Sequence, residues 1–135
     1  MKNISKISLL AFAALAIVLS SCSKYEEGNV SLASKKSRLV NHWKTKKITA
    51  DGYDITGLNI ITEVEIFDNN KIDVYSGSTV NHGAWVFNPG KTAVLVTNND
   101  GSLTNYEIVM LQKDELKVRT TNDDGVVFLH HYITY

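Results

Sequence analysis

The sequence predicts an all-β domain, folded as an eight-stranded antiparallel up-and-down barrel that follows an N-terminal export signal. Beyond residue 39, short apolar-patterned runs alternate with turn sequences, and no stretch of ten or more residues has a helical period. Most connections are short, so consecutive strands are expected to pair antiparallel. Closing the last strand onto the first would bury one apolar face and remove both sheet edges, which an open sheet would expose.

The expected strands are residues 42–49, 60–67, 71–76, 83–87, 92–97, 102–111, 115–121 and 126–135. Glu63 and Glu65 alternate with apolar neighbours, as is typical of a half-buried strand. Residues 88–91 (Asn-Pro-Gly-Lys) predict a type II turn. Residues 122–125 (Asn-Asp-Asp-Gly) predict another hairpin.

Two segments between these strands are expected to be irregular. Residues 77–81 are expected to form a loop, and residues 50–59 form the one long connection. The alternative architecture is a β-sandwich, which needs long connections that cross between sheets. Only residues 50–59 could provide one.

Residues 1–21 have the features of an export signal. Lys2 and Lys6 precede an apolar run at residues 7–19, which as a helix would be shorter than the roughly 30 Å hydrocarbon core of a bilayer. The quartet at residues 19–22 (Leu-Ser-Ser-Cys) resembles the lipobox of bacterial lipoproteins. This resemblance implies cleavage before Cys22, whose thiol carries the lipid that anchors the mature chain to a membrane. The alternative is a secretory signal cleaved elsewhere, which leaves Cys22 as a free thiol.

Cleavage before Cys22 leaves a mature chain long enough for one hydrophobic core and no second domain. Residues 22–36 then comprise the lipidated cysteine and a polar, flexible tether, and residues 37–135 form the barrel. Glu26 and Glu27 resemble an acidic export signal of some Bacteroidetes-type lipoproteins, although they also fit a solvated linker. The resemblance implies a lipid-anchored protein of the bacterial cell envelope, at the outer membrane and exposed on the cell surface.

Charge and motif content exclude several functions. The formal net charge is zero, so the chain lacks the positive field of a nucleic-acid-binding protein. No nucleophile elbow or phosphate-binding loop is present, which favours a non-catalytic protein without a cofactor. His130 and His131 are adjacent and would face opposite sides of a strand, so they cannot jointly bind one metal ion. His42 and His82 are isolated in the sequence.

Residues 38–43 (Arg-Leu-Val-Asn-His-Trp), followed by the eight-strand pattern, resemble the small lipocalin-like lipoproteins of Bacteroidetes-type bacteria. In lipocalins a Gly-x-Trp motif opens the first strand, and the Trp closes one end of the barrel beneath a short helical turn. Trp43 matches this Trp, while Asn41 stands in place of the Gly and tolerates the left-handed conformation better than most residues do. The resemblance covers residues 38–135 by pattern and Trp43 by motif. It implies a cup that can hold a small apolar molecule.

Strand alternation assigns ten side chains to the barrel interior: Thr45, Val64, Ile66, Ile72, Val74, Tyr106, Ile108, Met110, Leu116 and Val118. They can either fill the interior or line an apolar lumen. If Trp43 closes the bottom, Lys47 lies on the same strand face nearer the open end, where it needs an acidic partner or solvent. The candidate ligand-binding residues are therefore Trp43, Lys47, Tyr106, Ile108 and Met110. Tyr53, Ile55 and Leu58 could form a lid, or tuck onto the barrel.

Two functions remain open. The chain could be an anchored protein that binds a small hydrophobic or amphipathic molecule, or a structural or protein-interaction lipoprotein with a solid barrel and no ligand. Residues 84–87 are apolar on both strand faces, which makes Trp85 the best candidate for contact with a protein partner. A lumen well below about 300 Å³ would count against ligand binding.

Overall fold

The computed structural model describes residues 34–58 and 61–135. Its strands are β1 (His42–Ala50), β2 (Tyr53–Asp54), β3 (Ile61–Ile66), β4 (Lys71–Ser76), β5 (Thr79–Phe87), β6 (Ala93–Thr97), β7 (Leu103–Leu111), β8 (Glu115–Thr121) and β9 (Val127–Thr134). A short helix, α2 (Lys35–Leu39), precedes β1, and a 3-10 turn, η1 (Thr56–Leu58), follows β2. The predicted signal segment, Cys22 and most of the predicted tether lie outside the described residues.

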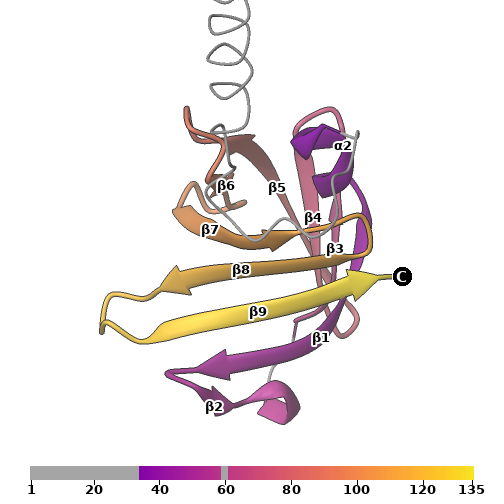
Figure 1. Ribbon diagram of the computed structural model, residues 1–135. Coiled ribbons are helices and arrows are strands. Elements are labelled where there is room, and N and C mark those ends of the chain that lie inside the picture. Colours follow the sequence, from indigo (N-terminus) through magenta and orange to yellow (C-terminus); the bar gives the residue numbers. More distant parts are fainter. Residues whose placement is uncertain (1–33, 59–60) are drawn as a thin grey trace, which may run out of the picture.

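The strands form one antiparallel sheet that closes on itself. Its order is β2-β1-β3-β4-β5-β6-β7-β8-β9, and β1 also pairs with β9. Figure 1 shows β9 lying between β8 and β1. Eight strands therefore form the barrel, and β2 is a two-residue addition to the end of β1. The predicted all-β barrel is confirmed, and the closure excludes the sandwich alternative.

Helix α2 covers one end of the barrel, which is its closed end. Trp43 is completely buried there, and its indole N–H donates a hydrogen bond to the Leu39 carbonyl at 2.9 Å. The buried Arg38 donates from Nη1 to the Leu111 carbonyl at 3.0 Å, which ties the helix to the end of β7. Trp43 thus lies beneath a short helix, as the lipocalin resemblance implies. The helix begins at Lys35, inside the segment predicted to be tether.

Strand β5 begins earlier than the sequence indicates. Residues 79–81, expected to be loop, pair with residues 74–76 of β4 and extend the ladder across a two-residue turn. Gly77 in this turn has a φ of +63°, a value that glycine adopts without strain. The long connection at residues 50–59 contains β2 and η1, which alternation alone does not predict.

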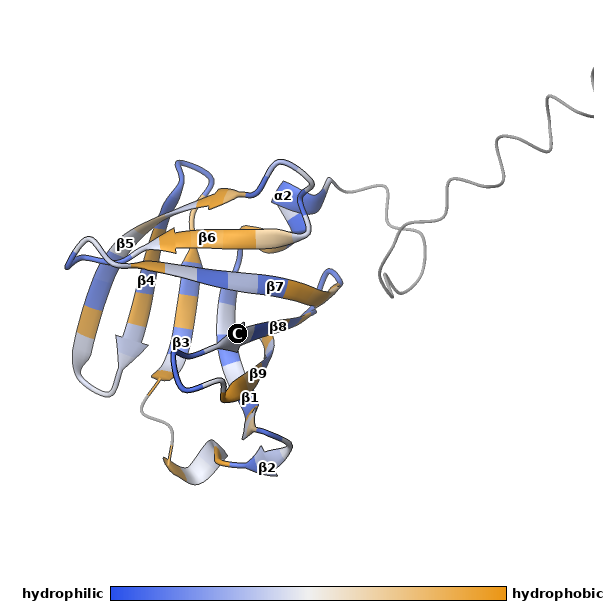
Figure 2. Ribbon diagram, turned by 90° about the vertical axis from the view of Figure 1, so that its left-hand side faces the viewer, coloured by the Kyte–Doolittle hydropathy of each residue, from blue (hydrophilic) through white to orange (hydrophobic). Residues whose placement is uncertain are grey.

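The core fills the closed end and the middle of the barrel. Figure 2 shows hydrophobic and hydrophilic segments alternating along β3, β4 and β5, as expected for strands with one face toward a core. The largest fully buried side chains are Trp43, Trp85, Leu39, Ile48 and Leu111. The predicted interior positions Val64, Ile66, Ile72, Ile108, Leu116 and Val118 are all buried in the same cluster.

We predict that Gly83→Ala destabilises the barrel. A Cβ at this position would lie 2.8 Å from the backbone oxygen of Thr97, which cannot move aside as a flexible side chain could. The expected loss is about 1–3 kcal/mol of unfolding free energy, measured by urea denaturation. Gly57→Ala is the control, because a Cβ there meets nothing within 4 Å. Equal stability of the two variants would contradict the close approach of β5 to the end of β6.

Candidate functional site

A β-bulge in β1 decides which side chains face the lumen. Between Thr45 and Lys47 the register with β9 shifts, so that Lys47 pairs with His131 and Ile48 pairs with His130. Ile48 is 1% exposed, whereas Lys47 is exposed on the outer wall. The predicted position of Lys47 in the upper lumen is wrong, because one extra residue reverses the alternation of every residue after it.

A second bulge, in β7, changes another predicted site residue. Ile108 pairs with Val118, but Met110 pairs with Lys117 and Leu111 with Leu116. Ile108 and Leu111 are buried in the core, and Met110 is not part of it. The predicted inward position of Met110 is therefore wrong for the same physical reason. Tyr106 and Ile108, which precede the bulge, do face inward.

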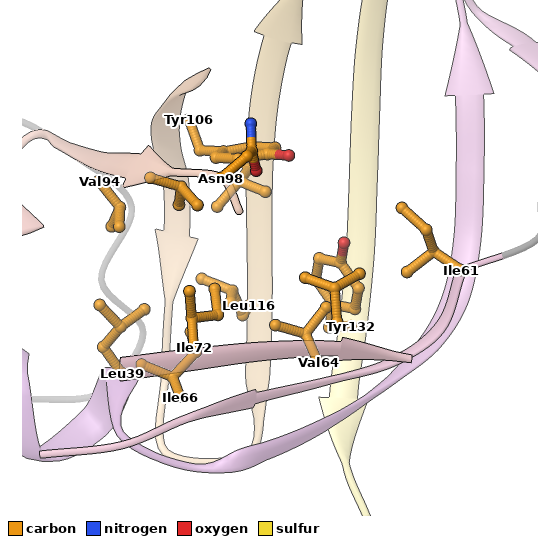
Figure 3. A pocket seen from close by; sticks show the side chains of 13 residues that line it. Leu39, Ile61, Val64, Ile66, Ile72, Val94, Asn98, Tyr106, Leu116 and Tyr132 are labelled. Carbon is orange, nitrogen blue, oxygen red and sulfur yellow. The ribbon is translucent and has the colours of Figure 1, made fainter. Parts of the chain in front are cut away.

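A small apolar cavity lies within the barrel, and we call it the inner chamber. Its volume is about 60 Å³, and ten of its thirteen lining residues are aliphatic. Figure 3 shows Leu39 and Ile66 at one end of it and Asn98 and Tyr106 at the other. Trp43 lies among the packed side chains of the closed end and does not line the chamber. The chamber is far smaller than a drug-sized pocket of roughly 300 Å³.

Above the chamber the barrel widens into a larger depression, the mouth hollow, with a volume of about 650 Å³. The two spaces adjoin, because six residues line both: Ile61, Ile72, Val74, Val96, Asn98 and Tyr106. The rest of the hollow is mainly polar and includes Ser76, Asn81, Asp100 and Ser102. The sequence analysis missed Asn98 and Asp100 as site residues. Their segment (residues 98–101, Asn-Asn-Asp-Gly) signals a turn, and nothing in it signals that the turn borders a cavity.

The hollow exists because neighbouring strands separate toward the open end. The β5–β6 ladder stops at Ala84 and Thr97, although β5 extends back to Thr79. The β7–β8 ladder likewise stops at Glu107 and Arg119. Where β7 and β8 separate lies a second depression, which we call the side cleft. Its volume is about 730 Å³, and its lining includes Ile48, Phe128 and His130.

Aromatic rings separate the inner chamber from the side cleft. The His130 ring stacks on the Tyr132 ring, with 6.0 Å between the ring centroids. It also meets the Tyr106 ring edge-on, again with 6.0 Å between the centroids. His130 Nδ1 and the Tyr132 hydroxyl are 3.3 Å apart, within hydrogen-bonding distance. Burial lowers the pKa of His130 and raises the pKa values of Tyr106 and Tyr132. All three side chains are therefore uncharged at neutral pH, and this aromatic part of the wall is polar but carries no charge.

The remaining histidines are each near a carboxylate, and His82 also lines the mouth hollow. His42 Nε2 is 2.8 Å from Glu63 Oε2, and His82 Nδ1 is 2.6 Å from Asp73 Oδ1. His131 pairs with Glu115. His130 and His131 thus face opposite sides of β9, as predicted. Among the described residues, no group of three or more histidine, cysteine, aspartate or glutamate side chains could hold a metal ion.

Trp85 does not form an exposed surface. It is 1% exposed, and its indole N–H donates to the Phe67 carbonyl at 2.9 Å inside the barrel. The Trp85 ring is therefore not itself available for contact, and the predicted protein partner near Trp85 stays a prediction. The outward face of this region carries the cross-strand pair Val86 and Leu95, which are 50% and 37% exposed.

The connection from β1 to β3 does not close the mouth as a lid. Tyr53 and Leu58 are 78% and 84% exposed, and of the predicted lid residues only Ile55 lines the side cleft. Hydrogen bonds anchor this segment, because the Ile55 N–H donates to the Ile48 carbonyl at 2.9 Å and the Ile48 N–H donates to Thr56 Oγ1 at 3.0 Å. The open end is thus accessible from solvent.

Comparison with models of protein families gives no match for this chain, and neither does comparison with curated proteins. Within residues 34–58 and 61–135, no helix is long and apolar enough to cross a bilayer.

Proposed function

We propose that this chain is a non-catalytic, lipid-anchored protein of the bacterial cell envelope whose barrel binds the apolar end of a small amphipathic molecule. The observation that carries this proposal is the continuity of the apolar inner chamber with the polar mouth hollow, through their six common lining residues. An amphipathic molecule matches this arrangement, because its apolar end would face the chamber and its polar head would face the hollow.

The volumes limit how such a molecule would bind. A chamber of about 60 Å³ admits only the end of an alkyl chain or a comparably small group. The hollow of about 650 Å³ is large enough for the rest of the molecule. We therefore infer shallow binding, with the terminal carbons beside Val64, Ile72 and Val74 and the polar head near Asn98.

The lipid anchor is proposed from the sequence. The charged start, the apolar run and the cysteine occur in the order found in bacterial lipoprotein signals, and Cys22 precedes α2 by a short polar segment. The buried Trp43 beneath a short helix supports kinship with the lipocalin-like lipoproteins of Bacteroidetes-type bacteria. We place the protein at the outer membrane, with Glu26 and Glu27 favouring surface exposure.

The second candidate is a structural or protein-interaction lipoprotein without a ligand. The small chamber favours this function, because the lower barrel is almost solid. In that case the exposed pair Val86 and Leu95 would contribute the contact surface, and filling the chamber would have no functional consequence.

We predict that Val74→Phe abolishes binding of octyl glucoside, an uncharged amphiphile, because the larger ring occupies the junction of chamber and hollow. Val86→Phe makes the same chemical change on the outer wall and should leave binding intact. Isothermal titration calorimetry below the critical micelle concentration measures both variants and the parent chain. Absence of binding to the parent chain, or equal binding by all three, would support the solid-barrel alternative.

We also predict that Cys22→Ser releases the protein from the membrane. Without the thiol no diacylglyceryl group can be attached, and the apolar contribution of the acyl chains is lost. Expression of both forms in a bacterial host, followed by membrane fractionation and labelled-palmitate incorporation, measures the effect. Ser20→Ala is the control that keeps the cysteine. Equal membrane retention and labelling of the Cys22→Ser form would refute lipidation at this residue.

A further inference from the structure

We propose that the mouth hollow selects amphiphiles with a positively charged head over those with a negatively charged one. This inference rests on the proposed binding function and names the ligand class for the same site. Four features of the open end support it. The hollow is mainly polar, a single carboxylate lines it, a tyrosine ring lies at the entrance of the inner chamber, and the connections at this end carry acidic but no basic side chains.

The connections at the open end carry charge of one sign. Residues 51–60, 77–78, 98–102 and 122–126 include no lysine or arginine, but they include five aspartates: Asp51, Asp54, Asp100, Asp123 and Asp124. All five are exposed. The closed end is different, since Lys35, Lys36, Lys91 and Lys113 accompany Asp68 and Asp114 there. The connections of the open end therefore contribute a net negative charge, although Lys47 of β1 interacts with one of the five, Asp54.

Asp100 brings this charge to the wall of the hollow itself. Asp100 Oδ1 accepts hydrogen bonds from Ser102 N at 2.9 Å and from Ser102 Oγ at 2.6 Å. These bonds hold the pKa of Asp100 below its ordinary value, so the carboxylate is ionised at neutral pH. It is the only carboxylate among the described residues that line the hollow, and none of those residues is a lysine or arginine. The one basic side chain in this lining, His82, has Nδ1 2.6 Å from Asp73 Oδ1, so a carboxylate stands beside it.

The bulge in β1 removes the one cation that alternation would have placed inside. Because Ile48 takes the inward position, Lys47 cannot neutralise an anionic head within the lumen. The inner chamber has no charged side chain in its lining either. An anionic amphiphile would therefore place its head near Asp100 without a compensating cation, at an electrostatic cost.

Tyr106 offers a favourable contact to a cation at the entrance of the chamber. Its ring lines both the chamber and the hollow, and Figure 3 shows it beside Asn98. Its hydroxyl makes no hydrogen bond to another described residue, and the pKa of this hydroxyl is raised by burial. The face of a neutral tyrosine ring attracts ammonium groups, and more strongly where water is partly excluded.

The test compares three amphiphiles with the same alkyl chain: octyltrimethylammonium, octyl glucoside and octyl sulfate. Calorimetry on the mature chain, below the critical micelle concentration and at 0.15 M salt, should show the cation binding about five to ten times more tightly than the anion. This factor is the size expected of a few exposed carboxylates whose field is screened over about 8 Å. In 1 M salt the ratio should fall toward one.

Matched variants locate the effect. Asp100→Asn with Asp123→Asn keeps the side-chain shape and should reduce the preference for the cation. Asp68→Asn with Asp114→Asn makes the same change in net charge at the closed end and should preserve it. Equal affinity for the cation and the anion would overturn the charge selectivity, and so would a preference that both variant pairs reduce equally. In either case, binding of octyl glucoside would still support the proposed function. Failure of all three amphiphiles to bind would overturn both.

Discussion

The hydrogen-bonded ladder between β1 and β9 is the constraint on which the rest of the structure depends. It runs from Trp43 opposite Thr134 to Ala50 opposite Phe128 and joins the first barrel strand to the last. Without it, the apolar face of the sheet would be open to solvent and the edges of the barrel would be unpaired. Closure turns that face into an interior, with α2 covering one end and the mouth hollow at the other.

The points at which the hydrogen-bonded ladders end also shape the barrel. The β5–β6 and β7–β8 pairings end before their strands do on the side of the open end. The barrel is therefore tightly packed toward the closed end and wider toward the open end. The packed part excludes a deep ligand site and leaves only a small apolar chamber. Several polar side chains of the wider, open end come from the turns between strands. Asp100, for example, accepts a hydrogen bond within its own turn and also lines the mouth hollow.

The sequence was sufficient for the architecture because the architecture is encoded locally. Turn residues punctuate the chain, and strands such as β4 and β8 have the predicted bounds. The polar start of β5 was missed because residues 79–81 have no apolar alternation, and their strand conformation comes from pairing with β4. The site was predicted less well, since Lys47 and Met110 each follow a bulge. A bulge is defined by the partner strand, which lies far away in the sequence, so strict alternation cannot reveal it.

The most direct test of this account is nuclear magnetic resonance measurement of cross-strand contacts between β1 and β9. The closed barrel predicts backbone nuclear Overhauser effects that connect Thr45 with Tyr132 and Ile48 with His130, with a one-residue offset at Lys46. An open sheet would instead show β1 in contact with β3 and β9 in contact with β8, and no contacts between β1 and β9. That result would contradict the closure, and with it the interior on which the proposed binding site depends.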